Sequence, residues 1–184
     1  MKKHSILFLT FLASILLFTS CGQVAKNIAK DTLSGDYQGT MSFEFKMSIL
    51  NLGLQDVTQQ QKCFVKVFST PESPSLVYSI LKPDGGFYKP VNVKIAAIQL
   101  NTNGASFNIP QQQINDENSS YFVEGVSMFA DADGNKVDGA VDDQSNFAFT
   151  YSGNLPIPIR GQTYEIPCVI TCNAKKIDIK ASLN

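Results

Sequence analysis

The sequence contains no tryptophan, one histidine and one arginine among its 184 residues. The histidine, His4, precedes a long apolar run that we interpret below as an export signal, so the exported chain would contain no histidine. Its loss excludes the usual proton shuttle near neutral pH, the usual partner of a serine or cysteine nucleophile, and the commonest nitrogen ligand of zinc. We therefore expect a protein that is not an enzyme, since only catalysis by paired carboxylates would remain.

Clusters of basic residues are also missing. Arg160 is the only arginine, and without residues 1–20 the chain has 13 basic and 16 acidic residues, a net charge of −3. Nucleic acid is bound by grouped lysine and arginine side chains that meet its phosphates. We therefore expect no nucleic-acid partner.

The longest apolar run lies at the start of the chain. Lys2 and Lys3 precede it, it extends from Ile6 to Phe18, and small residues follow it. About 13 apolar residues are too few for the roughly 20 that a membrane span needs. A basic start, an apolar centre and a small-residue end are typical of a secretory signal peptide, here residues 1–20.

The end of this segment, Thr19-Ser20-Cys21-Gly22, resembles the lipobox of bacterial lipoproteins. Phe18 departs from the motif, which usually has an aliphatic residue there. The resemblance implies that Cys21 is acylated, becomes the first residue of the mature protein and attaches it to a membrane. The alternative is ordinary secretion, with Cys21 left as a spare thiol.

The rest of the chain divides into a short polar segment and one domain. Residues 21–33 are interpreted as the lipidated cysteine and a tether, although Val24 and Ile28 would also share one face of a short helix. Residues 34–184 form a single domain that is large enough for a hydrophobic core.

Alternation of apolar and polar residues is the main signal of secondary structure. Met41, Phe43, Phe45, Met47 and Ile49 alternate with polar residues, which predicts a strand with one buried and one solvated face. A parallel strand covered on both sides would be apolar throughout, so the sheet is predicted to be antiparallel. Further strands are predicted at 63–69, 76–81, 91–100, 105–109, 121–130, 147–151, 164–172 and 177–183.

The connections are predicted from turn residues and from breaks in the alternation. Residues 50–61 are predicted to form a loop or one helical turn, residues 110–120 a polar loop, and residues 173–175 a turn. Asn103-Gly104 is a strong hairpin signal. Residues 155–159 contain two prolines and so cannot form a central strand, and Pro167 suggests a sheet edge or a bulge.

Eight to ten short strands with frequent turns predict an all-β fold, an antiparallel meander closed into an up-and-down β-barrel or folded as a β-sandwich. Gly35-Asp36-Tyr37-Gln38-Gly39, opening an alternating strand after a lipobox and a short polar segment, resembles the Bacteroidetes lipoproteins with calycin-like (lipocalin-like) β-barrels. Tyr37 would replace the tryptophan of the lipocalin motif, and Arg160 does not lie where the lipocalin arginine would be. The resemblance implies a cup-shaped barrel with a small apolar ligand and carries no catalytic residues.

Three cysteines remain after Cys21, and an exported chain can form disulfides. Cys168 and Cys172 are predicted to share one face of one strand, ~13 Å apart, whereas a disulfide needs Cα atoms within ~7 Å. The candidate bridge therefore joins Cys63 to Cys168 or to Cys172. The alternative is three buried thiols that pack as small hydrophobic side chains.

Residues 131–143 contain the highest density of carboxylates in the chain. Asp131, Asp133, Asn135 and Asp142 occupy the first, third, fifth and twelfth places of a calcium-binding EF-hand loop. Lys136 stands where that loop needs glycine, and flanking helices are not predicted. The alternative is a solvated hairpin loop whose Asp-Gly pairs serve turn geometry.

Taken together, the sequence predicts a non-catalytic, lipid-anchored β-barrel of the bacterial envelope, with calcium as the only candidate cofactor. The anchor on Cys21 would hold it to the outer membrane, facing the periplasm, because Gly22–Lys26 contains no acidic export signal. We expect the barrel to bind a small or extended ligand: a lipid, a glycan fragment or a peptide. The alternative is a structural or protein-interaction lipoprotein with a filled core and an envelope protein as partner.

Overall fold

The computed structural model describes residues 24–49, 53–68, 73–116, 119–131, 133–159 and 162–178. Cys21 and Arg160 lie outside these ranges. A helix at residues 24–33 is followed by thirteen strands. The strands are β1 (Gly35–Ile49), β2 (Gly53–Phe68), β3 (Ser75–Ile80), β4 (Val91–Lys94), β5 (Ala96–Asn101), β6 (Gly104–Asn108), β7 (Gln112–Asp116), β8 (Ser119–Gly125), β9 (Phe129–Ala130), β10 (Lys136–Val137), β11 (Gly139–Asp142), β12 (Asn146–Ile159) and β13 (Gln162–Ile177).

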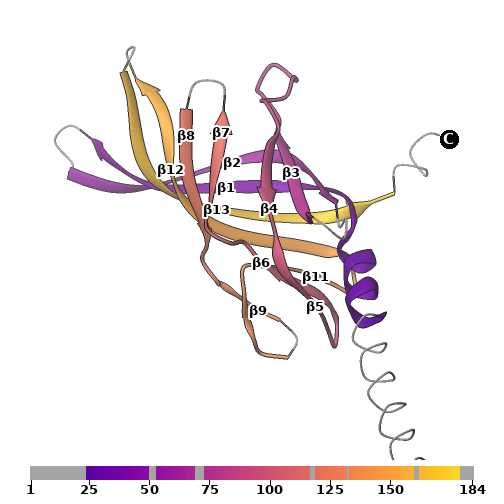
Figure 1. Ribbon diagram of the computed structural model, residues 1–184. Helices are drawn as coiled ribbons and strands as arrows, with labels where there is room; N and C mark the ends of the chain where they lie inside the picture. Colours follow the sequence, from indigo (N-terminus) through magenta and orange to yellow (C-terminus); the bar gives the residue numbers. More distant parts are fainter. Residues whose placement is uncertain are drawn as a thin grey trace, which may run out of the picture.

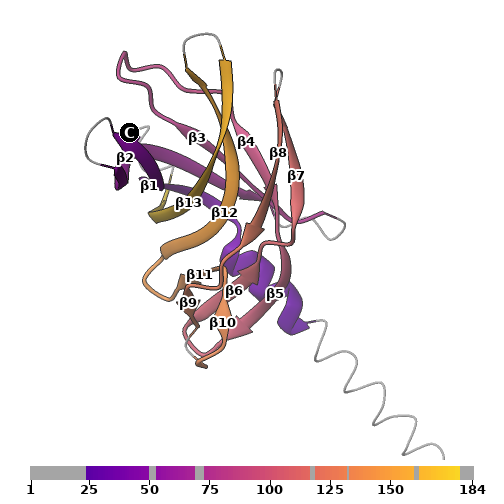
Figure 2. The ribbon, with the colours of Figure 1, turned by 90° about the vertical axis from the view of Figure 1, so that its left-hand side faces the viewer.

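Eight of these strands form an antiparallel barrel that is nearly closed (Figures 1 and 2). Their order is β4-β3-β2-β1-β13-β12-β8-β7. The last gap, between β4 and β7, is bridged by a side chain: Gln112 accepts a hydrogen bond from the Lys94 amide (2.7 Å) and donates one to the Lys94 carbonyl (2.9 Å). The predicted antiparallel all-β fold is confirmed, in its barrel form.

The sheet branches at β12, because the two halves of this long strand have different neighbours. Phe147 to Phe149 pair with β11, whereas Tyr151 to Gly153 pair with β8. Through β11 the sheet continues to β6 and β5, which lie with the β9–β10 hairpin below the barrel in Figure 2. This branch and the helix close one end of the barrel.

The prolines within β12 and β13 lie where the strand lacks a partner on one side. Pairing between β1 and β13 ends at Phe45 and Cys168, and Pro167 is the next residue of β13. Pro156 and Pro158 lie in the part of β12 that pairs with β13 but extends beyond β8. Since proline has no N–H for a ladder hydrogen bond, these edge positions tolerate it, as the sequence predicted.

Several predicted connections are instead strands, which corrects the sequence interpretation. β2 begins at Gly53, within the predicted loop 50–61, and the predicted loop 110–120 contains the β7–β8 hairpin. Residues 173–175 continue β13 rather than forming a turn. The weak alternation at residues 55–62 has a physical cause, since most of these side chains are exposed and no packed core constrains them.

The outcome also differs, or lies outside the described residues, for two other predicted strands and for the predicted tether. The predicted strand at 91–100 is divided at Ile95, and Ala97 has a positive φ of 50° that breaks the alternation. The predicted last strand, 177–183, falls almost entirely outside the described residues. The segment interpreted as a tether contains the helix, in which Ala29 and Leu33 are completely buried.

Candidate functional site

The closed half of the barrel is filled by aromatic side chains, which determines where a ligand can bind. Tyr37 stacks on Phe147 with ring centroids 4.4 Å apart, and Phe147 stacks on Phe107 at 5.9 Å. All three side chains are essentially inaccessible to solvent. An eight-stranded barrel is just wide enough for its own side chains, and here they occupy the space that an enclosed ligand would need.

A buried pair of tyrosines lies at the upper limit of this packed region. The hydroxyl groups of Tyr78 and Tyr151 are 2.5 Å apart, and Tyr151 stacks on Phe149 at 6.1 Å. Burial raises the pKa of Tyr78 and of Tyr151 well above the ordinary value, so both phenols remain protonated at physiological pH. Each hydroxyl therefore satisfies the other inside the apolar core.

Beyond the tyrosine pair, the inward positions stay apolar but become partly exposed. On β1, Tyr37 and Met41 are fully buried, whereas Phe43 and Phe45 are only partly buried. On β12, Leu155 is likewise half-buried, four residues after the buried Tyr151. The barrel therefore has one closed, filled end and one open end.

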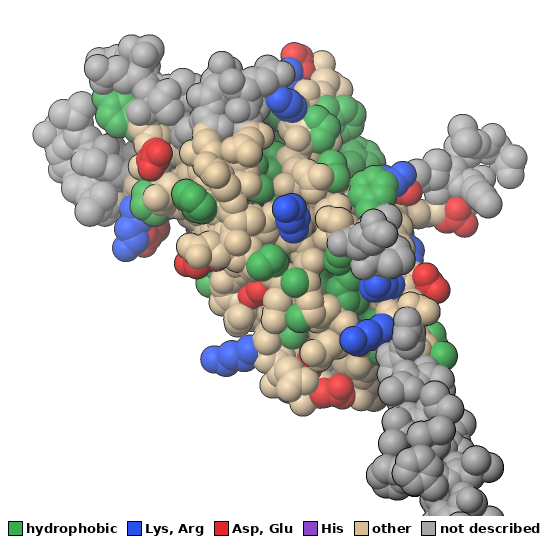
Figure 3. All heavy atoms as spheres, in the orientation of Figure 1, with side chains coloured by type: hydrophobic (Ala, Val, Ile, Leu, Met, Phe, Trp, Pro, Cys, Tyr) green, Lys and Arg blue, Asp and Glu red, His purple; other side chains and the backbone are tan. Residues whose placement is uncertain are grey.

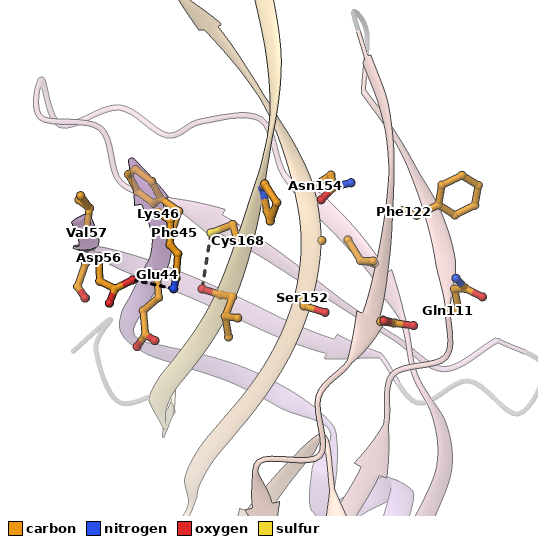
Figure 4. Close-up of a pocket in the computed structure, with 16 residues that line it drawn as sticks. Glu44, Phe45, Lys46, Asp56, Val57, Gln111, Phe122, Ser152, Asn154 and Cys168 are labelled. Atoms are coloured by element: carbon orange, nitrogen blue, oxygen red, sulfur yellow. Dashed lines mark hydrogen bonds and ion pairs between the residues drawn. The ribbon is translucent and has the colours of Figure 1, made fainter. Parts of the chain in front are cut away.

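A groove of about 730 Å³ lies beside the open end. It crosses five neighbouring strands, each of which contributes three consecutive residues around a common level (Figure 4). The lining residues are Glu44, Phe45, Lys46, Asp56, Val57, Thr58, Gln111, Phe122, Val123, Glu124, Ser152, Gly153, Asn154, Pro167, Cys168 and Val169.

The lining of the groove includes residues from both faces of the sheet. In the triplet Glu44-Phe45-Lys46 the outer two residues are exposed and Phe45 is partly buried, whereas on β12 Ser152 is partly buried and Asn154 is exposed. Val123 and Cys168, which are buried, also belong to the lining, so outward-facing and inward-facing residues both bound the groove. Its five strands span about 19 Å, four interstrand spacings of ~4.8 Å.

The groove combines exposed charge with apolar surface. Lys46 and Asp56 form an ion pair at 3.7 Å, with both side chains largely exposed. Glu44 and Glu124 add two negative charges, and Phe122, which is 60 % exposed, adds an aromatic ring. On the face shown in Figure 3, acidic and basic side chains are interspersed among apolar ones.

The two glutamates do not have the spacing of a glycosidase carboxylate pair. Glu44 on β1 and Glu124 on β8 are separated by β13 and β12, so their backbones lie ~14 Å apart. Glycosidase carboxyl groups are about 5–10 Å apart. The groove therefore offers hydrogen bonds and apolar contact, and this pair does not fit that mechanism.

Two of the candidate calcium ligands, Asp131 and Asp142, use their carboxylate oxygens within their own turns, and the Asp133 carboxylate accepts a hydrogen bond from the Thr102 hydroxyl. The Asp131 carboxylate accepts hydrogen bonds from the amides of Asp133 (3.0 Å) and Asn135 (2.8 Å) and from the Asn135 side chain. Asp142 accepts the equivalent bonds from Gln144 and Asn146. These donors occupy the lone pairs that a cation would need, and within the described part of the chain no three acidic or cysteine side chains form a metal-binding group.

The most deeply buried carboxylate of the loop belongs to Asp138, which was not among the candidate ligands. It accepts hydrogen bonds from the Ile109 amide (2.7 Å) and from both the amide and the hydroxyl of Ser127 (2.6 and 2.9 Å). Asp138 thereby joins the ends of β6 and β8 to the start of β11. It is a structural residue rather than a ligand-binding one.

The three cysteines are free thiols in this structure. Cys63 and Cys172 face each other with sulfur atoms 3.8 Å apart, and Cys168 lies elsewhere on the inward face of β13. β1 separates β2 from β13, so the backbones at Cys63 and Cys172 are about two interstrand spacings, ~9.6 Å, apart, and the register offsets the two residues by two positions along β1. That separation exceeds the ~7 Å limit for a disulfide, and neither candidate bridge is formed here.

The groove has only a weak signal in the sequence. The groove is built partly from residues 56–58, interpreted as a loop, and from polar residues on the outer faces of strands. Outward polar residues are what any antiparallel strand presents to water. Only the cross-strand register, which brings Glu44 beside Val169 and Glu124 beside Ser152, assembles them.

Comparisons with protein-family models, curated proteins and solved structures found no match to this chain. The described residues contain no helix with the length and apolar character of a membrane span.

Proposed function

We propose that this protein is a non-catalytic lipoprotein of the bacterial envelope that binds an extended polar ligand, a glycan fragment or a peptide, across the groove beside its open end. The observation that carries the proposal is a groove of about 730 Å³ next to a barrel interior that is already filled. The filled interior argues against an enclosed lipid, because an acyl chain would need the space that Tyr37, Phe147 and Phe149 occupy.

The chemistry of the groove supports an extended ligand. Its ~19 Å width matches about six residues of extended peptide at ~3.3 Å each, or a short oligosaccharide. Thr58, Ser152 and Asn154 supply hydrogen-bonding groups, and the exposed ring of Phe122 supplies a flat apolar surface. Glu44 and Glu124 give the site a negative character that favours neutral or cationic ligands.

Native mass spectrometry of the full-length protein, extracted from a bacterial envelope in mild detergent, tests the proposal. We expect a non-covalent adduct that dissociates on activation and has the mass of a glycan or a peptide. The Ser152→Lys variant, which fills the centre of the groove, should lose at least nine-tenths of the adduct. Gln99→Lys, the same change at an exposed position on β5, should retain it.

Three results would contradict the proposal. The first is an unliganded mass in every preparation. The second is an adduct retained equally by both variants, which would place the ligand elsewhere. The third is a fatty-acid adduct, which would indicate that the interior opens to admit an acyl chain.

A protein-interaction role is the second candidate function, and a cluster of exposed aromatic side chains favours it. Phe87 and Tyr88 are each nearly half exposed, and Phe87 packs edge-on against Phe64 with centroids 5.5 Å apart. A photoreactive residue in place of Phe87 should crosslink to an envelope protein if this role is correct. The same residue in place of Phe122 should crosslink preferentially if the groove is the binding site.

A further inference from the structure

The helix that precedes the barrel is fixed to its closed end. Ala29 and Leu33 are completely buried, and the Tyr37 hydroxyl donates a hydrogen bond to the Leu33 carbonyl (2.6 Å). The ammonium group of Lys176, at the end of β13, bonds the Thr32 carbonyl (3.3 Å) and lies 5.8 Å from the Tyr37 ring. The helix therefore moves with the barrel and is not a flexible tether.

The start of this helix lies very close to the proposed lipid attachment point. Cys21 is three residues before Val24, and a fully extended chain spans at most ~3.6 Å per residue. An acyl chain on Cys21 would therefore hold the membrane surface within ~11 Å of the first helical turn. From this geometry we infer that the helix lies against the membrane and that the open end of the barrel points away from it.

The exposed side of the helix has the chemistry of a membrane-contacting surface. Val24 and Ile28 are 56 % and 48 % exposed and lie four residues apart, so they share one face. Lys26 is exposed too, but it lies two residues from each of them and so on a different side of the helix. The nearby lipid anchor identifies the membrane as the occupant of this surface.

This orientation has a consequence for the binding groove. β1 begins at Gly35, beside the helix, and reaches the groove at Glu44, nine residues and up to ~30 Å along the strand. In Figure 1 the helix and the free ends of β12 and β8 lie on opposite sides of the molecule. The groove would therefore face the aqueous compartment, accessible to a polymer or peptide that is not part of the membrane.

The absence of tryptophan from the chain allows a direct test. The inference rests on the lipid anchor of the proposed function, so that anchor is measured first. Protein expressed from the full-length sequence and purified from a bacterial envelope is mixed with vesicles of three parts phosphatidylethanolamine and one part phosphatidylglycerol. Its flotation with the vesicles is compared with that of Cys21→Ser. Two variants, Ile28→Trp on the helix and Tyr164→Trp near the free end of β13, are then placed in vesicles containing brominated lipid.

We expect the wild-type protein to float, Cys21→Ser to remain unbound, and brominated lipid to quench the Ile28→Trp variant at least twofold more than the Tyr164→Trp variant. Failure of the wild-type protein to float would refute the lipid anchor itself, and the orientation with it. Flotation with equal quenching of both variants, or with stronger quenching of Tyr164→Trp, would overturn the orientation alone and leave the anchor intact.

Discussion

The carboxylate of Asp138 lies directly against the backbone of Gly125 and occupies the space where a Cβ atom would be. This contact lets the carboxylate reach the Ile109 amide and the Ser127 amide and hydroxyl at once. Three strands that are distant in sequence, β6, β8 and β11, are held together at this point. A single buried acidic side chain therefore fixes where the branch that closes the barrel leaves the main sheet.

We predict that Gly125→Ala destabilises the protein by about 2 kcal/mol, because the new methyl group must displace the Asp138 carboxylate. Gly125 has no positive φ, so the contact alone opposes the substitution. In an Asp138→Ala background the same change should cost far less, since the obstructing group is gone. Urea denaturation of the four proteins in this cycle measures the coupling.

The matched control is Gly86→Ala, in an exposed turn where the nearest atom to a new Cβ is the flexible Asp84 carboxylate at 3.4 Å. We expect little change there. Additive free energies in the Gly125 and Asp138 cycle would show that the two residues do not interact as the structure indicates.

The side-chain bridge between Gln112 and Lys94 gives a second prediction. Gln112→Glu keeps the acceptor for the Lys94 amide but replaces the donor that bonds the Lys94 carbonyl with a second acceptor oxygen. We expect a loss of about 1–2 kcal/mol and faster hydrogen exchange in β4 and β7. Gln99→Glu, the same change at an exposed position on β5, is the control. Unchanged exchange in β4 would mean that Gln112 does not close the barrel.

The two acidic turns explain why the sequence suggested a calcium site. Asp131 to Asn135 and Asp142 to Asn146 follow the same pattern, in which the aspartate accepts bonds from the amides two and four residues later and from the asparagine side chain. Oxygen-rich residues at short intervals suit both a cation and an Asx-type turn. The sequence alone cannot distinguish them, because only the three-dimensional structure shows whether the oxygens face an ion or the backbone.

These turns also predict how stability depends on pH. Burial raises the pKa of Asp142, but the stronger combined effect of the hydrogen bonds from Asn146 and Gln144, with the nearby charge of Lys175, lowers it below the ordinary value. A depressed pKa stabilises the folded state above the ordinary value of about 4, and the contribution disappears as the pH falls through the folded-state pKa. We expect Asp142→Asn to flatten the loss of stability below pH 4.

Denaturant midpoints at pH 7, 4 and 3 test this expectation. Asp143→Asn removes the adjacent carboxylate, which accepts none of the turn's hydrogen bonds, and serves as the control. If the denaturant midpoint falls equally between pH 4 and pH 3 in the wild type and in Asp142→Asn, this turn does not contribute to acid sensitivity.

A fourth prediction concerns the backbone conformation of the acidic turn from Asp131 to Asn135. Gly134 has a φ of +82° and no atom within 4 Å of a new Cβ, so only backbone strain opposes an alanine there. We expect Gly134→Ala to lower the unfolding free energy by about 1 kcal/mol. Gly86→Ala, which is similarly open but lacks a positive φ, should not. Equal costs for the two variants would contradict this account.

Sequence reasoning succeeded where one face of a strand is buried and the other is solvated. The alternation around Met41 and Phe43 predicted β1, and the prolines of β12 and β13 predicted strand positions without a partner on one side. It failed where that contrast disappears. Residues 55–62 are mostly exposed, and the helix at 24–33 buries only a narrow stripe around Ala29 and Leu33. The groove could not be predicted because its residues meet only through long-range register.

The last prediction concerns the cysteines, two of which lie on strands that are not neighbours in the sheet. Cys63 and Cys172 lie on strands separated by β1, so a disulfide between them would require the backbones to approach by more than ~2 Å. Burial raises the pKa of Cys168 to about 11, and the hydrogen bond with Cys63, together with burial, raises that of Cys172. At pH 8 both thiols are therefore protonated and covered, and we expect them to react with iodoacetamide only after unfolding.

Intact mass spectrometry of exported protein should show no 2 Da deficit, with Cys63, Cys168 and Cys172 alkylated in denaturant and almost none in native buffer. The hydrogen bond with Cys172 lowers the pKa of Cys63, so complete burial alone protects that thiol. Cys63→Ala should leave that pattern unchanged at the other two positions. A 2 Da deficit that disappears in Cys63→Ala would show that the oxidising envelope does draw β2 and β13 together. Rapid alkylation of Cys168 in native buffer would show instead that solvent enters the open end of the barrel as far as the inward face of β13.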